Sequence, residues 1–128
     1  MRSVVIKSVD PDTIEREVRA LVARWVAMLP EVEEVIWFGS WVRGVWGPGS
    51  DVDLCVILTR DSRRVQDRIP DFLPRQFPVG LDIFPYTREE FDSLARSHSS
   101  WHREILSRGR VMFSRNDTRS TSKPCPEP

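Results

Sequence analysis

Residues 35–58 read VIWFGSWVRGVWGPGSDVDLCVIL and contain two strand patterns on either side of a glycine-rich segment. The continuous apolar run 35–38 predicts a strand buried on both faces, and Gly39-Ser40 predicts a tight turn after it. A short helix over 41–46 and a loop at 47–49 follow. From Asp51 the residues alternate with a period of two, which predicts a second strand that carries acid at its first end.

Outward from this segment, the pattern predicts helices alternating with strands. Apolar residues at helical spacing predict a first helix over 11–29, between Asp10-Pro11 and Pro30. The other expected elements are two helical turns within 61–73, a strand over 79–84, a helix opened by the capping box 87–90, a helix that begins at Ser99 or Ser100 and ends at Gly109, and a strand over 111–113. This order predicts an α/β fold, a small mixed sheet of about four strands covered by helices.

The composition indicates one domain in a chain of 128 residues. We expect a single domain over residues 1–113 and a disordered tail over 114–128, which holds no core-forming residues. Nineteen basic and nineteen acidic residues give a formal net charge of zero, so there is no strong nucleic-acid signal. No apolar run is long enough to cross a membrane and no signal peptide is evident, which predicts a cytoplasmic protein.

Three aspartates carry the chemistry. Asp51 and Asp53 lie two residues apart on a strand, so their carboxylates share one face and favour a cation. Asp82 lies within the next apolar run, where an unpaired carboxylate is costly, and we expect it to join the pair. Carboxylates of this kind bind Mg²⁺ together with phosphate oxygens, which predicts two-metal phosphoryl or nucleotidyl transfer.

Four further residues are candidates for nucleotide binding. Gly39 and Ser40 follow the buried strand and point backbone N–H groups and a hydroxyl beyond its end, which suits a phosphate. Arg43 is equally consistent with a phosphate contact and with a surface ion pair. Ser50 directly precedes Asp51, and a hydrogen bond within its own loop is the more ordinary role for it.

The motif Gly-Ser, ten residues, Asp-x-Asp and an isolated third Asp in a strand resembles the polymerase-β-like nucleotidyltransferases. In detail the chain is similar to the minimal nucleotidyltransferase (MNT) group through Phe38-Gly39-Ser40, Arg43-Gly44, residues 50–54, Leu81-Asp82-Ile83 and residues 105–113. The resemblance implies ATP as the donor, two Mg²⁺ ions as the cofactor, and transfer of AMP to an acceptor hydroxyl. Gly39, Ser40, Arg43 and Ser50 would bind the nucleotide, and Asp51, Asp53 and Asp82 the metal.

The resemblance also implies a partner. Members of this group are commonly encoded beside a HEPN-domain helical protein, as the antitoxin that adenylylates it. Two other functions stay open: transfer to a small-molecule hydroxyl such as that of an antibiotic, which a homodimer could accommodate between subunits, and a catalytically silent antitoxin that binds by contact alone. The acceptor, the nucleotide preference and the oligomeric state, homodimer or hetero-oligomer, are not encoded in any motif.

Several residues outside the motif have ordinary structural interpretations. Trp41 departs from the basic residue usual in the family, and together with Trp46 it is expected to pack in the core or loop rather than on a base. We expect His98 and His102 at the surface, and Arg63, Arg64 and Arg68 on a solvated helix face. Cys55 is expected to be a small core residue.

Overall fold

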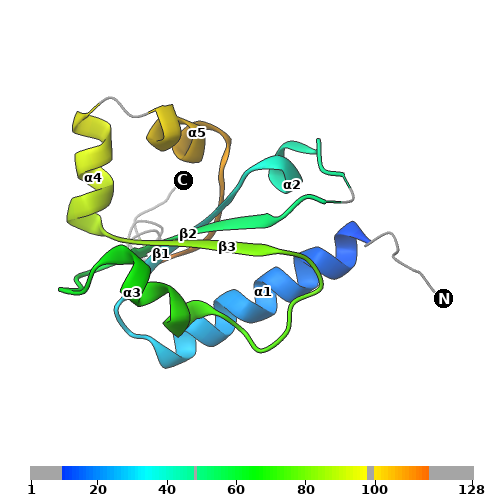
Figure 1. Cartoon of the computed structure of the whole chain (residues 1–128), viewed down its shortest axis with the longest axis horizontal. Helices are drawn as coiled ribbons and strands as arrows, with labels where there is room; N and C mark the ends of the chain where they lie inside the picture. Colours follow the sequence, from blue (N-terminus) through cyan, green and yellow to red (C-terminus); the bar gives the residue numbers. More distant parts are fainter. Residues whose placement is uncertain (1–9, 48, 98–99, 116–128) are drawn as a thin grey trace, which may run out of the picture.

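A four-stranded sheet forms the centre of the molecule. The computed structural model describes residues 10–47, 49–97 and 100–115. Its elements are α1 (Pro11–Met28), β1 (Val32–Phe38), α2 (Ser40–Arg43), β2 (Val52–Leu58), α3 (Val65–Arg68), the 3₁₀ helix η2 (Ile69–Phe72), β3 (Leu81–Thr87), α4 (Arg88–Arg96), α5 (Ser100–Arg108) and β4 (Arg110–Ser114). The chain thus alternates helices and strands in the predicted order (Figure 1).

The sheet has the strand order β3-β2-β1-β4 and is mixed. β1 pairs with β2 and with β4 in antiparallel fashion, whereas β2 and β3 are parallel. A parallel pair needs a crossover connection, and α3 with η2 lies within it. The register places Asp53 opposite Phe38 on one side and opposite Asp82 on the other. The predicted α/β fold with a small mixed sheet is confirmed.

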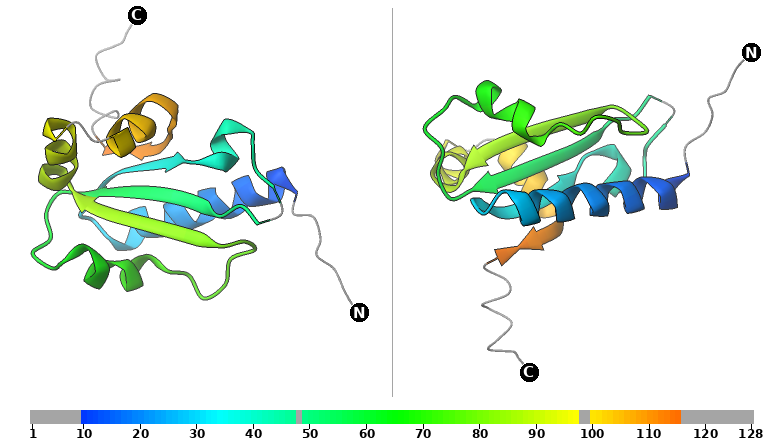
Figure 2. Two further views of the ribbon diagram at one scale, coloured as in Figure 1. Left: turned by 45° about the horizontal axis from the view of Figure 1, so that its top comes forward. Right: turned by 90° about the horizontal axis from the view of Figure 1, so that it is seen from below.

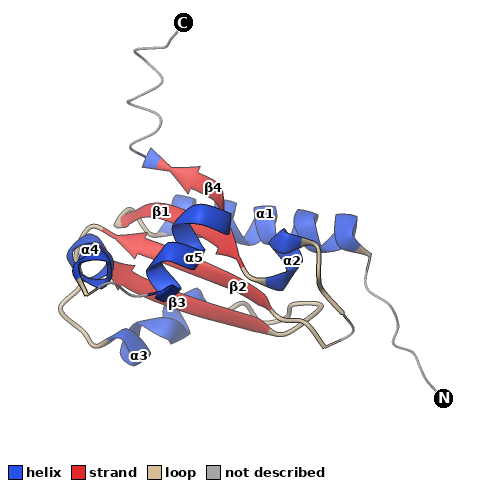
Figure 3. Cartoon of the chain, turned by 90° about the horizontal axis from the view of Figure 1, so that it is seen from above, coloured by secondary structure: helices blue, strands red, loops and turns tan. Residues whose placement is uncertain are grey.

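Helices cover both faces of the sheet. Figure 2 shows α1 running along one face, and Figure 3 shows α5 crossing the other face with α4 beside it. Five of the seven residues of β1 and six of the seven of β2 are buried. A strand that is covered on both faces has no solvent side, which explains the continuous apolar run that the sequence shows.

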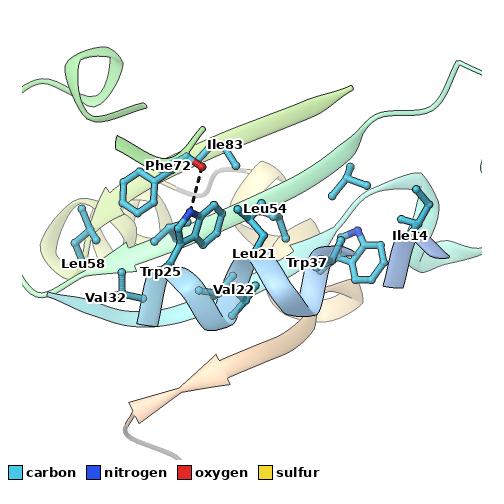
Figure 4. Packing of buried hydrophobic residues seen from close by; sticks show 14 residues of the cluster. Ile14, Leu21, Val22, Trp25, Val32, Trp37, Leu54, Leu58, Phe72 and Ile83 are labelled. Carbon is cyan, nitrogen blue, oxygen red and sulfur yellow. Dashed lines mark hydrogen bonds between the residues drawn. The ribbon is translucent and has the colours of Figure 1, made fainter. Parts of the chain in front are cut away.

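The two faces have separate cores. Beneath α1, the indole N–H of Trp25 donates to the carbonyl of Phe72 at 3.1 Å, and the two rings meet edge to face (Figure 4). This contact attaches η2 to α1. On the opposite face, a second cluster forms between the sheet, α4 and α5, and it contains Ile36, Phe38, Cys55, Ile57, Phe91 and Ile105. Trp25, Trp37 and Cys55 are buried as predicted.

Some element boundaries differ from the predicted ones for identifiable reasons. The short helix α2 ends at Arg43, earlier than predicted, because Gly44 adopts a left-handed conformation with φ of 79°. β3 runs on through Pro85, because it is an edge strand and a proline there removes no hydrogen bond that the sheet needs. β4 includes Ser114, paired opposite Glu34, although the tail was predicted to start at this residue.

Two predictions about polar side chains were wrong. Arg68 is not on a solvated face but is only 1% exposed, because backbone carbonyls and Glu90 surround its guanidinium. His102 is buried rather than at the surface, and its ring lies 4.6 Å from that of Phe91.

Some predictions concern parts of the chain outside the described residues. These are the surface position of His98 and the disorder of the tail beyond Arg115. Within the described residues, no helix combines the length and the apolar character that a membrane crossing requires.

Candidate active site

The predicted site residues meet at one end of the sheet, where β1 ends and both β2 and β3 begin. β1 is antiparallel to β2, so its last residue, Phe38, lies opposite Asp53 near the start of β2. β3 is parallel to β2, so it begins at the same end. Helix α2 follows β1 directly at this end of the sheet (Figure 3). The topology therefore brings Gly39, Asp53 and Asp82 together from three different strands or strand ends.

Gly39 makes room for the carboxylate of Asp53. Its φ is 94°, a conformation that residues with a side chain rarely adopt, and a β-carbon here would collide with Oδ2 of Asp53. Glycine is thus required twice at this position, by the backbone angle and by the close approach of the carboxylate.

Asp53 and Asp82 form the central pair of carboxyls. They are direct partners in the parallel register, and Asp53 is half-buried whereas Asp82 is exposed. Partial burial raises the pKa of Asp53 to about 6, with further contributions from the charge of Asp82, a hydrogen bond between the two carboxyls and the charge of Asp51. None of the three aspartates forms an ion pair with a described residue. The negative charge of this cluster is therefore available to a cation.

Asp51 lies at the edge of this pair. It is exposed, and its side chain lies over Gly80, where a β-carbon would collide with Oδ1 of Asp51. The backbone N–H of Val52 donates to the Gly80 carbonyl at 2.9 Å, which fixes the two chain segments beside each other. Among the described residues, no three Asp, Glu, His or Cys side chains are already arranged as a metal site.

The nucleotide-binding candidates divide into two groups. Ser40 and Arg43 lie on α2, three residues apart and hence on one side of this helical turn. Arg43 Nη1 donates to Glu104 Oε2 of α5 at 3.1 Å, so the ion-pair alternative for Arg43 is present in the structure. Ser50 is used within its loop, where its hydroxyl accepts a hydrogen bond from the N–H of Gly47 at 2.8 Å.

Trp41 of α2 and Trp46 of the loop that follows it contact each other. The rings of Trp41 and Trp46 are stacked with centroids 4.6 Å apart and an interplanar angle of 12°. The indole N–H of Trp41 donates to the Ser50 carbonyl at 3.2 Å. Packing in the core or loop, the prediction for this pair, accounts for both contacts.

Sequence reasoning missed two residues of this region, Gly80 and Glu104. Gly80 did carry a signal, because it interrupts an apolar run directly before a strand, and an isolated glycine there indicates close approach of another chain segment. Glu104 carried none, because its partner lies 61 positions away in the sequence.

Comparisons with known proteins concern the family and the fold of the chain. The sequence profile of the nucleotidyltransferase domain matches residues 14–108. A Sulfolobus solfataricus protein described as a candidate nucleotidyltransferase has a similar structure, with a TM-score of 0.60 and 19% identity over 83% of this chain and 85% of that one. A toxin–antitoxin structure with AMP-PNP aligns with a TM-score of 0.50 and 13% identity over 79% and 77% of the two chains. A search among curated proteins found no match.

The family match identifies this chain as an enzyme of the transferase class. The chain belongs to the nucleotidyltransferase domain family, whose profile covers most of its length. The nucleotidyltransferase part of the resemblance drawn from the sequence motif is thereby confirmed.

Proposed function

We propose that this protein transfers AMP from ATP to a hydroxyl group of a protein partner in a Mg²⁺-dependent reaction, as the antitoxin of a HEPN/MNT pair. The observation that carries the proposal is the Asp53–Asp82 pair, in which two carboxyls crowd one position beside Gly39 with no basic partner among the described residues. Carboxyls held together against their mutual repulsion fit a divalent cation, which relieves it.

The donor set matches magnesium in its chemistry. Asp51, Asp53 and Asp82 offer only carboxylate oxygens, the ligands that Mg²⁺ prefers, and exposed positions on two of them leave room for water and phosphate oxygens. Two Mg²⁺ ions bound at these three aspartates would neutralise the charge of the triphosphate and lower the pKa of the attacking hydroxyl.

The residues of the chain have separate roles in this reaction. The N–H groups at Gly39 and Ser40 and the guanidinium of Arg43 hold the triphosphate, and Ser50 supports the loop next to it. The acceptor oxygen attacks the α-phosphorus, the bond to the bridging oxygen of the β-phosphate breaks, and pyrophosphate leaves. Asp82, the more accessible member of the central pair, receives the proton of the hydroxyl in this proposal.

The nature of donor and acceptor is supported by a structural neighbour. The toxin–antitoxin structure with the same fold contains the ATP analogue AMP-PNP, which favours ATP as donor and a protein as partner. We therefore propose that the partner is a helical HEPN-type protein and that the two proteins form a hetero-oligomer.

Intact-mass analysis tests the proposal directly. The purified protein is incubated with Mg²⁺ and ATP, with and without the protein encoded by the adjacent gene, and each protein is weighed. We expect the partner to gain one or more units of about 329 Da, the mass of an added AMP, and the Asp51→Ala variant to give no gain.

Two outcomes contradict the proposal. A complex that forms without any mass gain indicates an antitoxin that acts by contact. A gain that appears only when small-molecule hydroxyl compounds are supplied, on those compounds, indicates an enzyme of the antibiotic-modifying type.

A further inference from the structure

An ion pair links the short helix α2 to α5 beside the candidate active site. Arg43 Nη1 donates to Glu104 Oε2 at 3.1 Å, and the two side chains are 37% and 29% exposed. The residues are 61 positions apart, so this contact exists only because the fold places the two helices side by side.

Helix α5 covers the sheet face that carries the carboxyls. Trp101 of α5 meets Phe38 and Phe84 with ring centroids 5.4 and 4.9 Å apart. Phe38 lies opposite Asp53 in the sheet, and Phe84 is two residues beyond Asp82 and thus on the same face. Glu104, one turn after Trp101, therefore lies on the helix that borders the candidate site (Figure 3).

Arg43 keeps donors available while it binds Glu104. The guanidinium has five N–H donors, and the bond to Glu104 uses one nitrogen, Nη1. Its Nε and Nη2 make no hydrogen bond to a described residue. Because Arg43 lies on the same side of α2 as Ser40, these remaining donors belong to the side from which a phosphate would be held.

Glu104 has a second basic neighbour besides Arg43. Its other oxygen, Oε1, lies 4.0 Å from Nε of Arg108, on the next turn of α5. A long arginine side chain on a four-residue helix would otherwise move among many rotamers, and binding a phosphate would then cost that freedom. An anchored carboxylate removes part of this cost in advance.

We propose that Glu104 is a positioning residue, which orients the guanidinium of Arg43 towards the phosphates of the donor nucleotide. This inference rests on the proposed function, because it takes a nucleoside triphosphate as the ligand of Arg43. The opposite role would be competition, in which Glu104 occupies Arg43 and must be displaced by the nucleotide. The two roles predict changes of opposite sign when Glu104 is removed.

Titration of the full chain with ATP and Mg²⁺ in a calorimeter separates these roles. We expect Glu104→Ala to raise the Kd for ATP about three- to five-fold, the range that an exposed ion pair can supply. Glu104→Gln should bind nearly as the wild type does, because the amide oxygen still accepts from Nη1. Glu17→Ala, which removes an exposed carboxylate of α1, is the matched control and should leave the Kd unchanged.

A double-mutant cycle tests whether Glu104 acts through Arg43. Glu104→Ala should have no effect on the Kd in an Arg43→Ala background, and thermal melting of each variant excludes unfolding as the cause. A Kd that falls or does not change in Glu104→Ala, or an equal effect in both backgrounds, overturns the inference. The proposed function is judged separately, by whether the wild type binds ATP and Asp53→Ala does not. If it does, failure of the Glu104 inference leaves the proposed function standing. A wild type that does not bind ATP contradicts the inference and the proposed function together.

Discussion

The two ends of β2 differ in how their charges are balanced. At its start, Asp51, Asp53 and Asp82 gather without an ion-pair partner among the described residues, and the pKa of Asp53 is raised. Beyond its other end, Asp61 pairs with Arg63 at 2.8 Å, and the side-chain hydrogen bond from Arg63 lowers the pKa of Asp61 to about 2. Acidic residues thus flank the same strand in two opposite electrostatic settings.

At the second of these ends, beyond Leu58, the charges are balanced around Arg68. Its Nη1 donates to the Pro85 carbonyl at 2.9 Å and to Glu90 Oε1 at 2.7 Å, and further bonds reach the carbonyls of Asp61 and Arg63. Hydrogen bonding to Arg68 in turn lowers the pKa of Glu90. This one side chain ties together the segment after β2, the strand β3 and the start of α4.

The difference between the two ends of β2 distinguishes charges that stabilise the fold from charges that are kept for function. Paired charges with satisfied hydrogen bonds hold the fold together, whereas like charges kept close together lower stability and are retained where a ligand compensates them. The three predictions below test this separation.

The largest effect is expected from Asp53→Asn at the unbalanced end. Loss of this carboxylate should reduce AMP transfer about a thousand-fold or more, because it removes a metal ligand and several kcal/mol of transition-state stabilisation. The same change should raise the free energy of unfolding, because the repulsion between Asp53 and Asp82 disappears. We expect a gain of only about 1 kcal/mol, because the side chain is half-buried and solvent screens part of the repulsion. Labelled AMP transfer and chemical denaturation measure the two quantities. Lower stability together with full activity would remove the contrast between the two ends.

Arg68→Met should have the second largest effect, on stability alone. We expect the free energy of unfolding to fall by about 2–4 kcal/mol, because buried carbonyls lose their donor while the half-exposed Glu90 can still be hydrated. The matched control is Arg64→Met, whose side chain is 74% exposed and whose loss should change stability by about 0.5 kcal/mol or less. Urea denaturation gives both values, and equal losses in the two variants would show that burial of Arg68 contributes nothing.

The smallest effect concerns the acid dependence of stability. The pKa of Asp61 is about 2 in the folded chain and about 3.9 when unfolded. Its contribution is therefore fully present above about pH 5 and is lost as the pH falls towards 2. We expect this loss to be about 1 kcal/mol or less, because Arg63 is exposed to solvent, and to be missing in Asp61→Asn. Denaturation curves between pH 6 and pH 3 measure it, and parallel curves for both proteins would contradict the prediction.

The sequence predicted most of the fold because local patterns encode it. The helical spacing within α1, the capping box at Thr87 and the apolar runs of β1 and β2 each predicted an element that the structure contains. In the capping box, the Thr87 hydroxyl accepts from the N–H of Glu90 at 3.1 Å, as the residue types imply. Boundaries were less well predicted where a single residue decides them, as at Gly44 and Pro85.

The candidate site was predictable in its residues but not in its geometry. The Gly-Ser turn and the Asp-x-Asp pair are short-range patterns, so their positions could be assigned before the fold was known. That Asp51 lies over Gly80, and that Arg43 meets Glu104, depends on how strands and helices pack. No local pattern carries this information.

The sequence by itself determined the elements, the α/β class and the three acids, because helix and strand periodicity and turn residues act over a few positions. The tertiary structure decided how distant charges meet, including pairs that the sequence did not predict. The parallel register of β2 and β3 sets Asp82 beside Asp53, and the crossover between these strands buries Arg68 against Pro85 and Glu90. The reason is physical: the energy of a charge depends on its burial and on its neighbours within a few ångströms, and both are fixed only when the layers pack.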